Sequence, residues 1–561
     1  MNSNSHHKST ATPEDQPGFY SDSWKPVVLL LLLALVLYFA NLGGISLWGK
    51  DEFRYAEVAQ EILRSGNWFV LHLNNRPYPD KPPLYFWVVA LLSLPRGQVT
   101  AWTARLPLAI AGVAGVLLTY ILGTILFNRR KGFWSALILM VAGRYYWGIR
   151  WIRLDLPLVA FMFGSMGCFV YLYFERKKAS GVFAWLFWFF LGCALLVKGP
   201  PVLVIPAMIL VFLWIQKDWK FWGKLKWFPG FLIPLFMLLV WMIPAMKGGG
   251  KDYSQDMIWD QIAMRIFHSW RHRRPLPYYF YKLFGDFQPW ALLLPPALWY
   301  AWKQNKKGVH KRELTLLWCW FLCTIIPFSL VPGKRGAYIL PLYPALAMFV
   351  AYFLLPYFDN KKKVDLKIQI PLIILGVAFS ILCIGGLIYP KVLNRFDIEF
   401  RDLNLTPIIV LFLVTGIGIL VLVFRRAARA SILALFCFSY LILLTPFLML
   451  YPNFVTDQPI REITRLIMTN RKPGDMILMP DAGDPRYLLY ADYYIEEIPS
   501  PQWLIKMDRK GGIFFAVLED DDLDKIPNNW KRGRDYQVLY EAMVEDDYML
   551  LITNQNPENV R

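Results

Sequence analysis

Charged residues are scarce in this chain and cysteines are few. The first shortage limits the class of protein, and the second limits the roles of the cysteines. Asp, Glu, Lys and Arg make up 18% of the 561 residues, whereas hydrophobic residues make up 56%. Soluble globular proteins typically carry about 25% charged residues, so a soluble globule is excluded. The six cysteines all lie in apolar runs, which indicates small buried side chains rather than disulfide partners or metal ligands.

The chain contains long apolar runs that have almost no charged residues. They include residues 27–40, 161–174, 231–243 and 408–424. Helices built on such runs can cross a hydrocarbon core of about 30 Å. The first run has no small-residue cleavage site, so we expect a retained membrane span and not a cleaved signal peptide.

The net charge of +19 carries topological information, because Lys and Arg are gathered in short clusters between apolar runs. These clusters lie at residues 129–131, 176–178, 217–226, 303–312, 361–363 and 425–426. The positive-inside rule places all of them on the cytoplasmic side. The charge is therefore no sign of nucleic-acid binding, and we expect no nucleic-acid partner.

The intervals between the basic clusters predict about thirteen transmembrane helices. The predicted spans are 27–43, 102–128, 133–149, 155–174, 181–197, 201–216, 228–246, 290–302, 314–331, 338–357, 369–389, 406–424 and 430–450. An odd number of spans puts the two chain ends on opposite sides of the membrane. Residues 84–94 are too short for a span. If they were counted as one, every later basic cluster would move to the opposite side of the membrane, so we expect an interfacial helix there.

The composition changes after Tyr451 to mixed polar sequence with turn signals and short strand-like runs at 476–479, 513–517 and 548–552. This pattern predicts a small α/β domain. We therefore expect a cytoplasmic tail at 1–24, a transmembrane domain at 25–452 with an outer-face loop at 44–100, and a periplasmic α/β domain at 453–561.

The same topology gathers a set of ionisable residues at the outer ends of spans, where the positive-inside rule does not explain them. They include Asp51, Glu52, Arg54, Asp80, Lys81, Arg153, Asp155, Lys198 and Lys334. Ionisable groups at membrane depth are costly and are usually paired or functional. An anionic lipid headgroup is the natural partner for these cations.

Residues 48–63 follow the first span and show apolar side chains at helical spacing, which predicts an amphipathic helix on the outer membrane surface. Asp51 and Glu52 lie near its N-terminus. An alternative without chemistry is that Asp51 caps the helix and complements its dipole, for about 1 kcal/mol. The next outer segment sets Asp80 and Lys81 between prolines, ahead of aromatic residues that anchor at headgroup depth.

These two segments resemble the outer-loop signatures of the aminoarabinose transferase family, relatives of the protein O-mannosyltransferases among the C-type membrane glycosyltransferases. The family's Asp-Glu-x-Arg-Tyr-Ala-Glu run is matched by residues 51–57, and its Glu-Lys-Pro signature by Asp80-Lys81-Pro82, with an acid one methylene shorter. Further matches follow in order within residues 27–350: Arg153-Leu154-Asp155, Lys198-Gly199, His272-Arg273, Pro289-Trp290, Lys334 and Tyr338.

The resemblance implies a polytopic α-helical enzyme that transfers a sugar from a polyprenyl phosphate, such as undecaprenyl phosphate, with inversion. Its expected catalytic residues are Asp51, Asp155 and Glu52. Cations suit a phosphate leaving group, because they stabilise the charge that develops as the glycosidic bond breaks. The expected residues for the donor phosphate are Arg54, Lys81, Lys198, Lys334, Arg153 and Tyr338. The resemblance also suggests a divalent metal, zinc or magnesium, on Asp80 and His272.

The acceptor stays open between lipid A and another envelope glycan, lipid or protein, and the sugar is expected to be 4-amino-4-deoxy-L-arabinose or a relative. The expected location is the bacterial inner membrane, among its lipids, with the active site facing the periplasm. A transporter for lipid-linked glycans is the alternative from another class. It would place charged residues at mid-membrane depth and on both faces, whereas the unusual ones here are one-sided.

Overall fold

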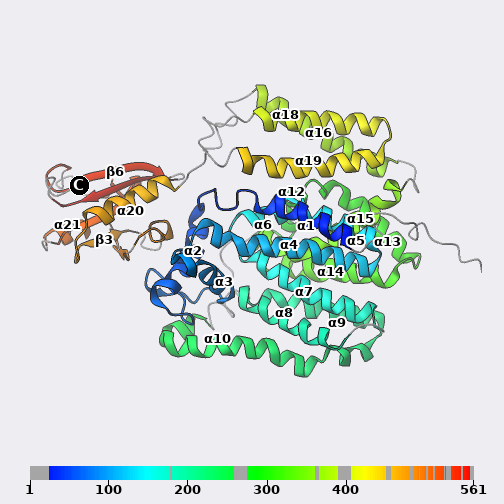
Figure 1. Ribbon diagram of the computed structural model, residues 1–561, viewed down its shortest axis with the longest axis horizontal. Helices are drawn as coiled ribbons and strands as arrows, with labels where there is room; N and C mark the ends of the chain where they lie inside the picture. Colours follow the sequence, from blue (N-terminus) through cyan, green and yellow to red (C-terminus); the bar gives the residue numbers. More distant parts are fainter. Residues whose placement is uncertain are drawn as a thin grey trace, which may run out of the picture.

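The computed structural model describes thirteen stretches of the chain: 24–176, 180–257, 274–359, 365–388, 406–449, 457–480, 484–491, 493–500, 503–509, 512–523, 525, 532–544 and 547–555. Long helices run side by side in a bundle, and a small domain with a β-sheet lies beyond one end of it (Figure 1). The predicted fold class, a polytopic helical membrane protein with a C-terminal α/β domain, is confirmed.

Within the described residues, twelve of the thirteen predicted spans correspond to one main helix each, and the span at 133–149 is divided between two. The bundle helices are α1 (Trp24–Phe39), α4 (Ala101–Leu126), α5 (Arg129–Met140), α7 (Asp155–Phe174), α8 (Val182–Lys198), α9 (Val204–Gln216), α10 (Trp227–Gln255), α13 (Leu294–Lys306), α14 (Lys311–Leu330), α15 (Tyr343–Phe358), α16 (Leu366–Ile388), α18 (Thr406–Phe424) and α19 (Ala428–Met449). In the described part of the chain, seven helical stretches are individually long and apolar enough to cross a membrane.

The predicted span at 133–149 differs from the structure, because the chain breaks at its middle into α5 and a separate helix, α6 (Gly143–Arg150). Ala142 is extended and precedes α6, and the Gly143 amide donates a hydrogen bond to the carbonyl of Gln288, 3.0 Å away. This bond to a distant loop takes the place of a helical bond, so the turn depends on tertiary structure.

Short elements at the domain end of the bundle make up the loops that the positive-inside rule predicts to face outward, and these are called the outer loops. They are α2 (Gly49–Ser65), β1 (His72–Leu73), β2 (Arg76–Pro77), α3 (Leu84–Ser93), η2 (Leu94–Arg96), α12 (Tyr278–Asp286), η6 (Ala291–Leu293) and η7 (Gly336–Leu342). Two further 3-10 helices, η3 (Pro200–Leu203) and η4 (Trp219–Leu225), join the bundle helices α8, α9 and α10. The amphipathic helix predicted at 48–63 is thus α2, and it ends at Gly66, whose φ of 68° suits glycine.

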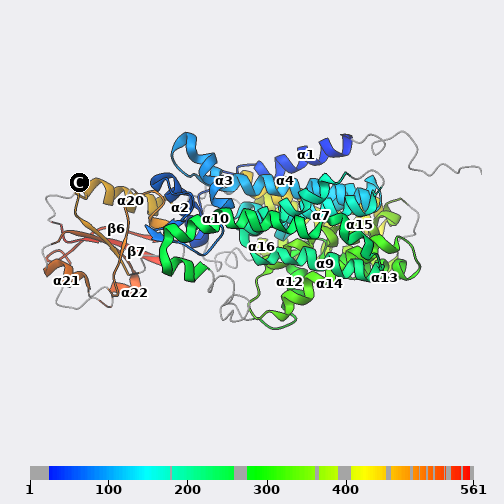
Figure 2. The same ribbon diagram turned by 90° about the horizontal axis from the view of Figure 1, so that it is seen from below.

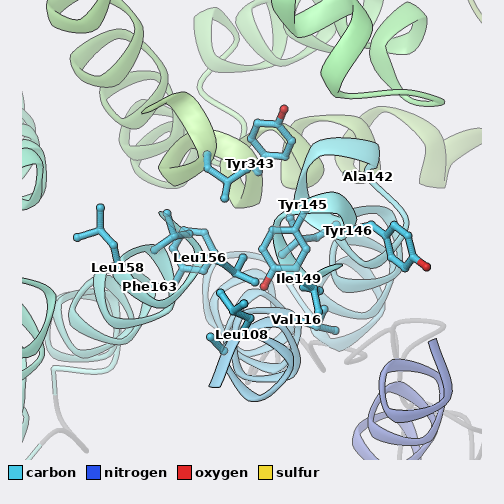
Figure 3. Packing of buried hydrophobic residues seen from close by; sticks show 14 of the residues in the cluster. Leu108, Val116, Ala142, Tyr145, Tyr146, Ile149, Leu156, Leu158, Phe163 and Tyr343 are labelled. Carbon is cyan, nitrogen blue, oxygen red and sulfur yellow. The ribbon is translucent and has the colours of Figure 1, made fainter. Parts of the chain in front are cut away.

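A tightly packed core supports the connection between α6 and α7. Figure 3 shows Tyr145, Leu156 and Tyr343 gathered with other apolar side chains where α4, α6, α7 and α15 meet. Tyr145 is fully buried, and its hydroxyl donates to the carbonyl of Gly112 at 2.9 Å, so its polar atom is satisfied. This packing therefore fixes the start of α7, where Asp155 is the first residue.

The helices α16, α18 and α19 form a separate layer of the bundle (Figure 1), and glycines let two of them approach closely. A Cβ atom added at Gly416 of α18 would lie 2.8 Å from the carbonyl oxygen of Gly376 on α16. Close approach at small residues is a common means of helix association in membranes.

Replacing Gly416 with Leu is expected to force α16 and α18 apart and to destabilise the protein by about 1–3 kcal/mol, the usual cost of overpacking. Thermal denaturation in detergent measures the loss. Gly418→Leu is the matched control, because a Cβ atom at Gly418 meets no atom within 4 Å. Equal melting temperatures for the two variants would contradict the helix crossing.

The C-terminal domain consists of α20 (Gln458–Asn470), η10 (Pro485–Tyr487), α21 (Trp503–Arg509), α22 (Asp520–Leu523) and a sheet. The strands are β3 (Met476–Met479), β4 (Glu496–Glu497), β5 (Phe514–Glu519), β6 (Gln537–Val544) and β7 (Asp547–Thr553), in the order β4-β3-β5-β7-β6. β3 pairs in parallel with β4 and β5, and β7 pairs antiparallel with β5 and β6. Both views place α2 beside this domain (Figures 1 and 2).

Candidate active site at the outer end of the bundle

An ion pair between two neighbouring helices forms the centre of the candidate site. Asp155 is the first residue of α7, and Lys198 is the last residue of α8. Their side chains form an ion pair and are only 13% and 18% exposed. The ammonium of Lys198 also lies 5.2 Å from the centre of the Tyr338 ring on η7. Three predicted site residues from three elements are thus brought together.

Two arginines add positive charge around this pair. Arg153, a predicted site residue, and Arg144 of α6 both interact electrostatically with the Asp155 carboxylate. Arg144 shares its helix face with Gly148, which lies against Leu156 of α7. The site therefore carries more positive than negative charge close to Asp155, which favours an anionic ligand.

The segment that leads into η7 is fixed by hydrogen bonds to another outer element. Lys334 is buried, and its ammonium donates to the carbonyl of Arg274 at 2.9 Å. The Tyr279 hydroxyl of α12 donates to the carbonyl of Arg335 at 3.3 Å. These bonds set the position of Tyr338, which comes one turn later and faces Lys198.

The first turn of α2 supplies the second acid and base of the site. Asp51 accepts a hydrogen bond from Arg54 at 3.1 Å, and both side chains are partly open to solvent. The charges of Asp51 and of Asp155 both act on Tyr55, whose pKa burial raises far above its ordinary value. Tyr55 is thus within electrostatic range of both the acid of α2 and the acid of α7, which brings the two predicted acids into one neighbourhood.

Asp80 and Lys81 lie in the loop between β2 and α3, and Lys81 donates a hydrogen bond to the carbonyl of Asp80 at 3.0 Å. The helix that follows packs its first aromatic residues on α2, with the rings of Tyr55 and Phe86 5.9 Å apart. The loop with the predicted acid and base is therefore next to α2, on the same outer end as Asp155.

Glu52 differs from the catalytic acid that the family motif implies. Its carboxylate is buried and accepts hydrogen bonds from the amides of Trp48 at 2.8 Å and Ile152 at 2.7 Å. It also forms an ion pair of 2.6 Å with Arg105 of α4. Because both carboxylate oxygens are engaged, these contacts suit a positioning role, and the catalytic role that the motif implies stays a prediction.

Sequence reasoning missed the arginines that organise the outer loops from inside the bundle. Arg105 donates to the carbonyls of Ile45 at 2.7 Å and Ser46 at 2.8 Å, besides binding Glu52. Arg150 of α6 donates to the carbonyls of Leu37 and Ala40, each at 2.6 Å. A signal existed for Arg105, because it is a charged residue within a predicted span.

The metal ligands expected at Asp80 and His272 cannot be placed together, because His272 lies outside the described residues. Among the residues that the structure describes, no group of three or more His, Cys, Asp and Glu side chains is gathered as metal ligands would be. The metal site on Asp80 and His272 therefore stays a prediction.

Glu57 of α2 is a buried carboxyl group that makes the stability of the protein depend on pH. Its side chain is fully buried, and burial raises the pKa of its carboxyl to about 8, although Arg64 acts in the opposite direction. In an unfolded chain the pKa of Glu is about 4.3. The folded state therefore binds a proton more tightly, and the resulting stability is present at low pH and lost as the pH rises through 8.

From about pH 6 to about pH 9, this single group is expected to remove about 2 kcal/mol of stability. Glu57→Gln keeps a hydrogen-bond acceptor for Arg64 but cannot ionise, so the melting temperature of the variant should depend less on pH than that of the wild type. Thermal denaturation across this pH range measures the difference. Parallel curves for the two proteins would show that Glu57 does not titrate there.

Comparison with known proteins agrees with this arrangement. The family of dolichyl-phosphate-mannose-protein mannosyltransferases matches residues 24–246. An undecaprenyl phosphate-alpha-4-amino-4-deoxy-L-arabinose arabinosyl transferase of Pectobacterium carotovorum is 26% identical over 93% of this chain and 98% of its own length. A second transferase of that name, from Proteus mirabilis, is 29% identical over 58% of this chain, which spans only 59% of that relative.

Among solved structures, ArnT from Cupriavidus metallidurans bound to undecaprenyl phosphate is 20% identical, with a TM-score of 0.74 over 96% of this chain and 99% of that protein. The fold and the outer site therefore define a multi-pass membrane protein with the C-type glycosyltransferase fold. The resemblance to the aminoarabinose transferase family is confirmed, and it extends over nearly the whole chain. The apolar helices together with these bacterial relatives support a multi-pass protein of the bacterial inner membrane.

Proposed function

We propose that the chain is an inverting glycosyltransferase that moves 4-amino-4-deoxy-L-arabinose from undecaprenyl phosphate to lipid A. The observation that carries the proposal is the Asp155–Lys198 pair, whose ammonium lies over the Tyr338 ring, with Arg153 and Arg144 within electrostatic range. Such a group of cations at the end of a membrane bundle suits a lipid phosphate. Two relatives are named for transfer from undecaprenyl phosphate, and the Cupriavidus protein binds this lipid, which supports this donor.

The proposal includes an active site that faces the periplasm. Two of the basic clusters, one in the first turn of α5 and one at the turn from α13 to α14, lie at the end of the bundle away from the C-terminal domain (Figure 1). By the positive-inside rule that end is cytoplasmic. The candidate site is at the other end, where both a lipid-linked sugar and lipid A could reach it from the outer leaflet.

In the proposed reaction, the bond between the sugar's anomeric carbon and the phosphate oxygen breaks, and the lipid phosphate leaves with the electron pair. Lys198 and Arg153 lie where they can stabilise that charge, with Arg54 and Lys81 in the adjoining outer segments. Asp155 holds the Lys198 ammonium in place.

The acceptor oxygen forms the new bond from the opposite face of the sugar, which inverts the configuration. If the acceptor is a hydroxyl group, Asp51 takes its proton as general base. If the acceptor is a phosphate of lipid A, no proton has to be removed. Asp51 then positions the acceptor or stabilises the positive charge on the sugar ring in the transition state.

A transferase for a protein or another glycan is the second candidate. It is favoured by the match of residues 24–246 to the protein mannosyltransferases, which covers the segments with Asp51, Lys81, Asp155 and Lys198. The chemistry at the phosphate would be the same in both cases, so the acceptor is what distinguishes the two candidates. Mass spectrometry of envelope lipids and proteins from a deletion strain separates them.

Transfer of a radiolabelled sugar in proteoliposomes tests the proposed function and its site. Asp51→Asn and Lys81→Ala are each expected to lower turnover by about a hundredfold, a usual loss when a catalytic or charge-stabilising group is removed. Turnover that survives both substitutions would overturn the assignment of the site. The same assay with a chelator, followed by added zinc or magnesium, tests the metal proposed on Asp80 and His272.

A further inference from the structure

The C-terminal domain is attached to the outer loops by side chains that the proposed chemistry does not use. Contacts join it to the segment before α2, to both ends of α2 and to the β1–β2 hairpin. The first of these is a hydrogen bond of 2.5 Å from the Ser46 hydroxyl to the buried carboxylate of Asp457. The strongest contacts involve Arg64 and Asn74.

Arg64, in the last turn of α2, joins three groups from two parts of the molecule. One guanidinium nitrogen donates to Glu57 at 2.6 Å. The other donates to the carbonyls of Ala491 at 2.7 Å and Leu488 at 3.3 Å, both in the C-terminal domain. Glu57 belongs to the family motif but has no part in the proposed chemistry. Its contact with Arg64 gives it a structural role, because it orients the Arg64 side chain toward the C-terminal domain.

Asn74 forms a second attachment in the turn of the β1–β2 hairpin. Its amide nitrogen donates to the carbonyl of Ile495 at 2.8 Å, and its amide oxygen accepts from the Ile495 backbone amide at 2.9 Å. Asn74 is buried, so water cannot replace these bonds without opening the interface. Nearby, Arg76 and Glu497 form an exposed pair of 3.0 Å, which is expected to contribute little.

The other end of α2 is held as well. Lys50 lies 3.5 Å from the carboxylate of Asp484, which is itself buried against Arg486 in the domain. The rings of Phe53 and Tyr490 meet edge to face, 6.1 Å apart. Lys50 and Phe53 flank the first turn of α2, where Asp51 lies. The domain therefore contacts α2 on both sides of the residue proposed as the base.

We propose that the C-terminal domain is a positioning element for the catalytic helix α2, and that Arg64 and Asn74 are the positioning residues that latch it in place. The inference rests on the proposed function, because it concerns the placement of Asp51 and Arg54. An error of about 1 Å in the position of a reacting group can lower a rate by about a hundredfold. A latch on α2 is thus sufficient to make activity depend on a domain that touches no substrate.

The full-length protein in proteoliposomes provides the test, with three measurements for each variant: kcat and KM for the sugar donor, the melting temperature, and hydrogen–deuterium exchange of residues 49–54. Arg64→Ala and Asn74→Ala are each expected to lower kcat by about tenfold and to change KM by less than about twofold. Exchange at 49–54 should become faster, although both substitutions lie outside that segment. The melting temperature should stay within a few degrees.

Arg76→Ala is the matched control at the same interface and should behave like the wild type. Arg64→Lys should recover part of the activity, because an ammonium can still bind Glu57 but cannot reach both carbonyls. If Asn74→Ala fails to fold, Asn74→Asp is measured instead, since it keeps the acceptor for the Ile495 amide.

Unchanged exchange at 49–54 in the variants, or faster exchange with an unchanged kcat, would overturn the latch. A fall in kcat that only follows a fall in melting temperature would also overturn it, since that indicates a merely structural role. If the wild-type protein transfers no sugar, the proposed function fails by itself. The exchange of residues 49–54 then still decides whether Arg64 and Asn74 hold α2.

Discussion

Replacing Lys198 with Met is expected to lower sugar transfer by about a hundred- to a thousandfold, the range seen when one stabilising donor is removed from a transition state. The ammonium is paired with Asp155 and lies over Tyr338, in a place where water has little access. A charge in such surroundings acts more strongly on a leaving phosphate than one in bulk water. Asp155→Asn leaves the cation in place, so its loss is expected to be smaller.

Steady-state kinetics in proteoliposomes measure both variants. Lys525→Met is a suitable control, because Lys525 also pairs with an aspartate, Asp522 at 2.8 Å, but on the exposed surface of the C-terminal domain. It should leave the rate unchanged. A Lys198→Met protein that is folded and transfers sugar at more than a tenth of the wild-type rate, about 1.4 kcal/mol of lost stabilisation, would place the phosphate elsewhere.

The second large effect is expected at Arg105, where Arg105→Met should destabilise the protein by about 3–5 kcal/mol. The substitution leaves the buried carboxylate of Glu52 without its charged partner and frees the carbonyls of Ile45 and Ser46. A lone buried charge is far more costly than a buried pair. The loss would appear as a lower melting temperature and poor yield in detergent.

The double variant Arg105→Met/Glu52→Gln distinguishes this cause from a simple loss of packing. The Glu52→Gln substitution replaces the carboxylate with an uncharged amide, whose oxygen can still accept a hydrogen bond from the backbone amide of Trp48 or Ile152. The double variant is therefore expected to be more stable than Arg105→Met alone. If it is less stable, the ion pair is not the source of the effect.

The spans could be predicted because an apolar run between two basic clusters has few alternatives in a membrane. The break between α5 and α6 could not, since it depends on a bond from Gly143 to Gln288, far along the chain. The strands β3, β5 and β7 follow from short apolar runs. The two-residue strand β4 does not, because it exists through pairing with β3.

The sequence predicts on which side of the membrane the candidate site lies, but it does not predict which side chains contact one another there. Topology alone places Asp155 and Lys198 at the outer ends of their spans, but their contact needs α7 and α8 to pack as an antiparallel pair. The family motif suggests chemistry for Glu52, whereas its hydrogen bonds to Ile152 and Arg105 are those of a residue that holds two segments together. A motif records which residues matter and does not separate the two kinds of role.

The pair between Glu52 and Arg105 also bears on how the chain enters the membrane during synthesis. An arginine near the outer end of an apolar helix opposes insertion, and a partner already present on the far side lowers that cost. Glu52 precedes Arg105 by 53 positions, so its carboxylate emerges from the ribosome first. Because Glu52 comes first along the chain, its carboxylate can already be on the outer side when α4 inserts. It can then pair with the Arg105 guanidinium during insertion.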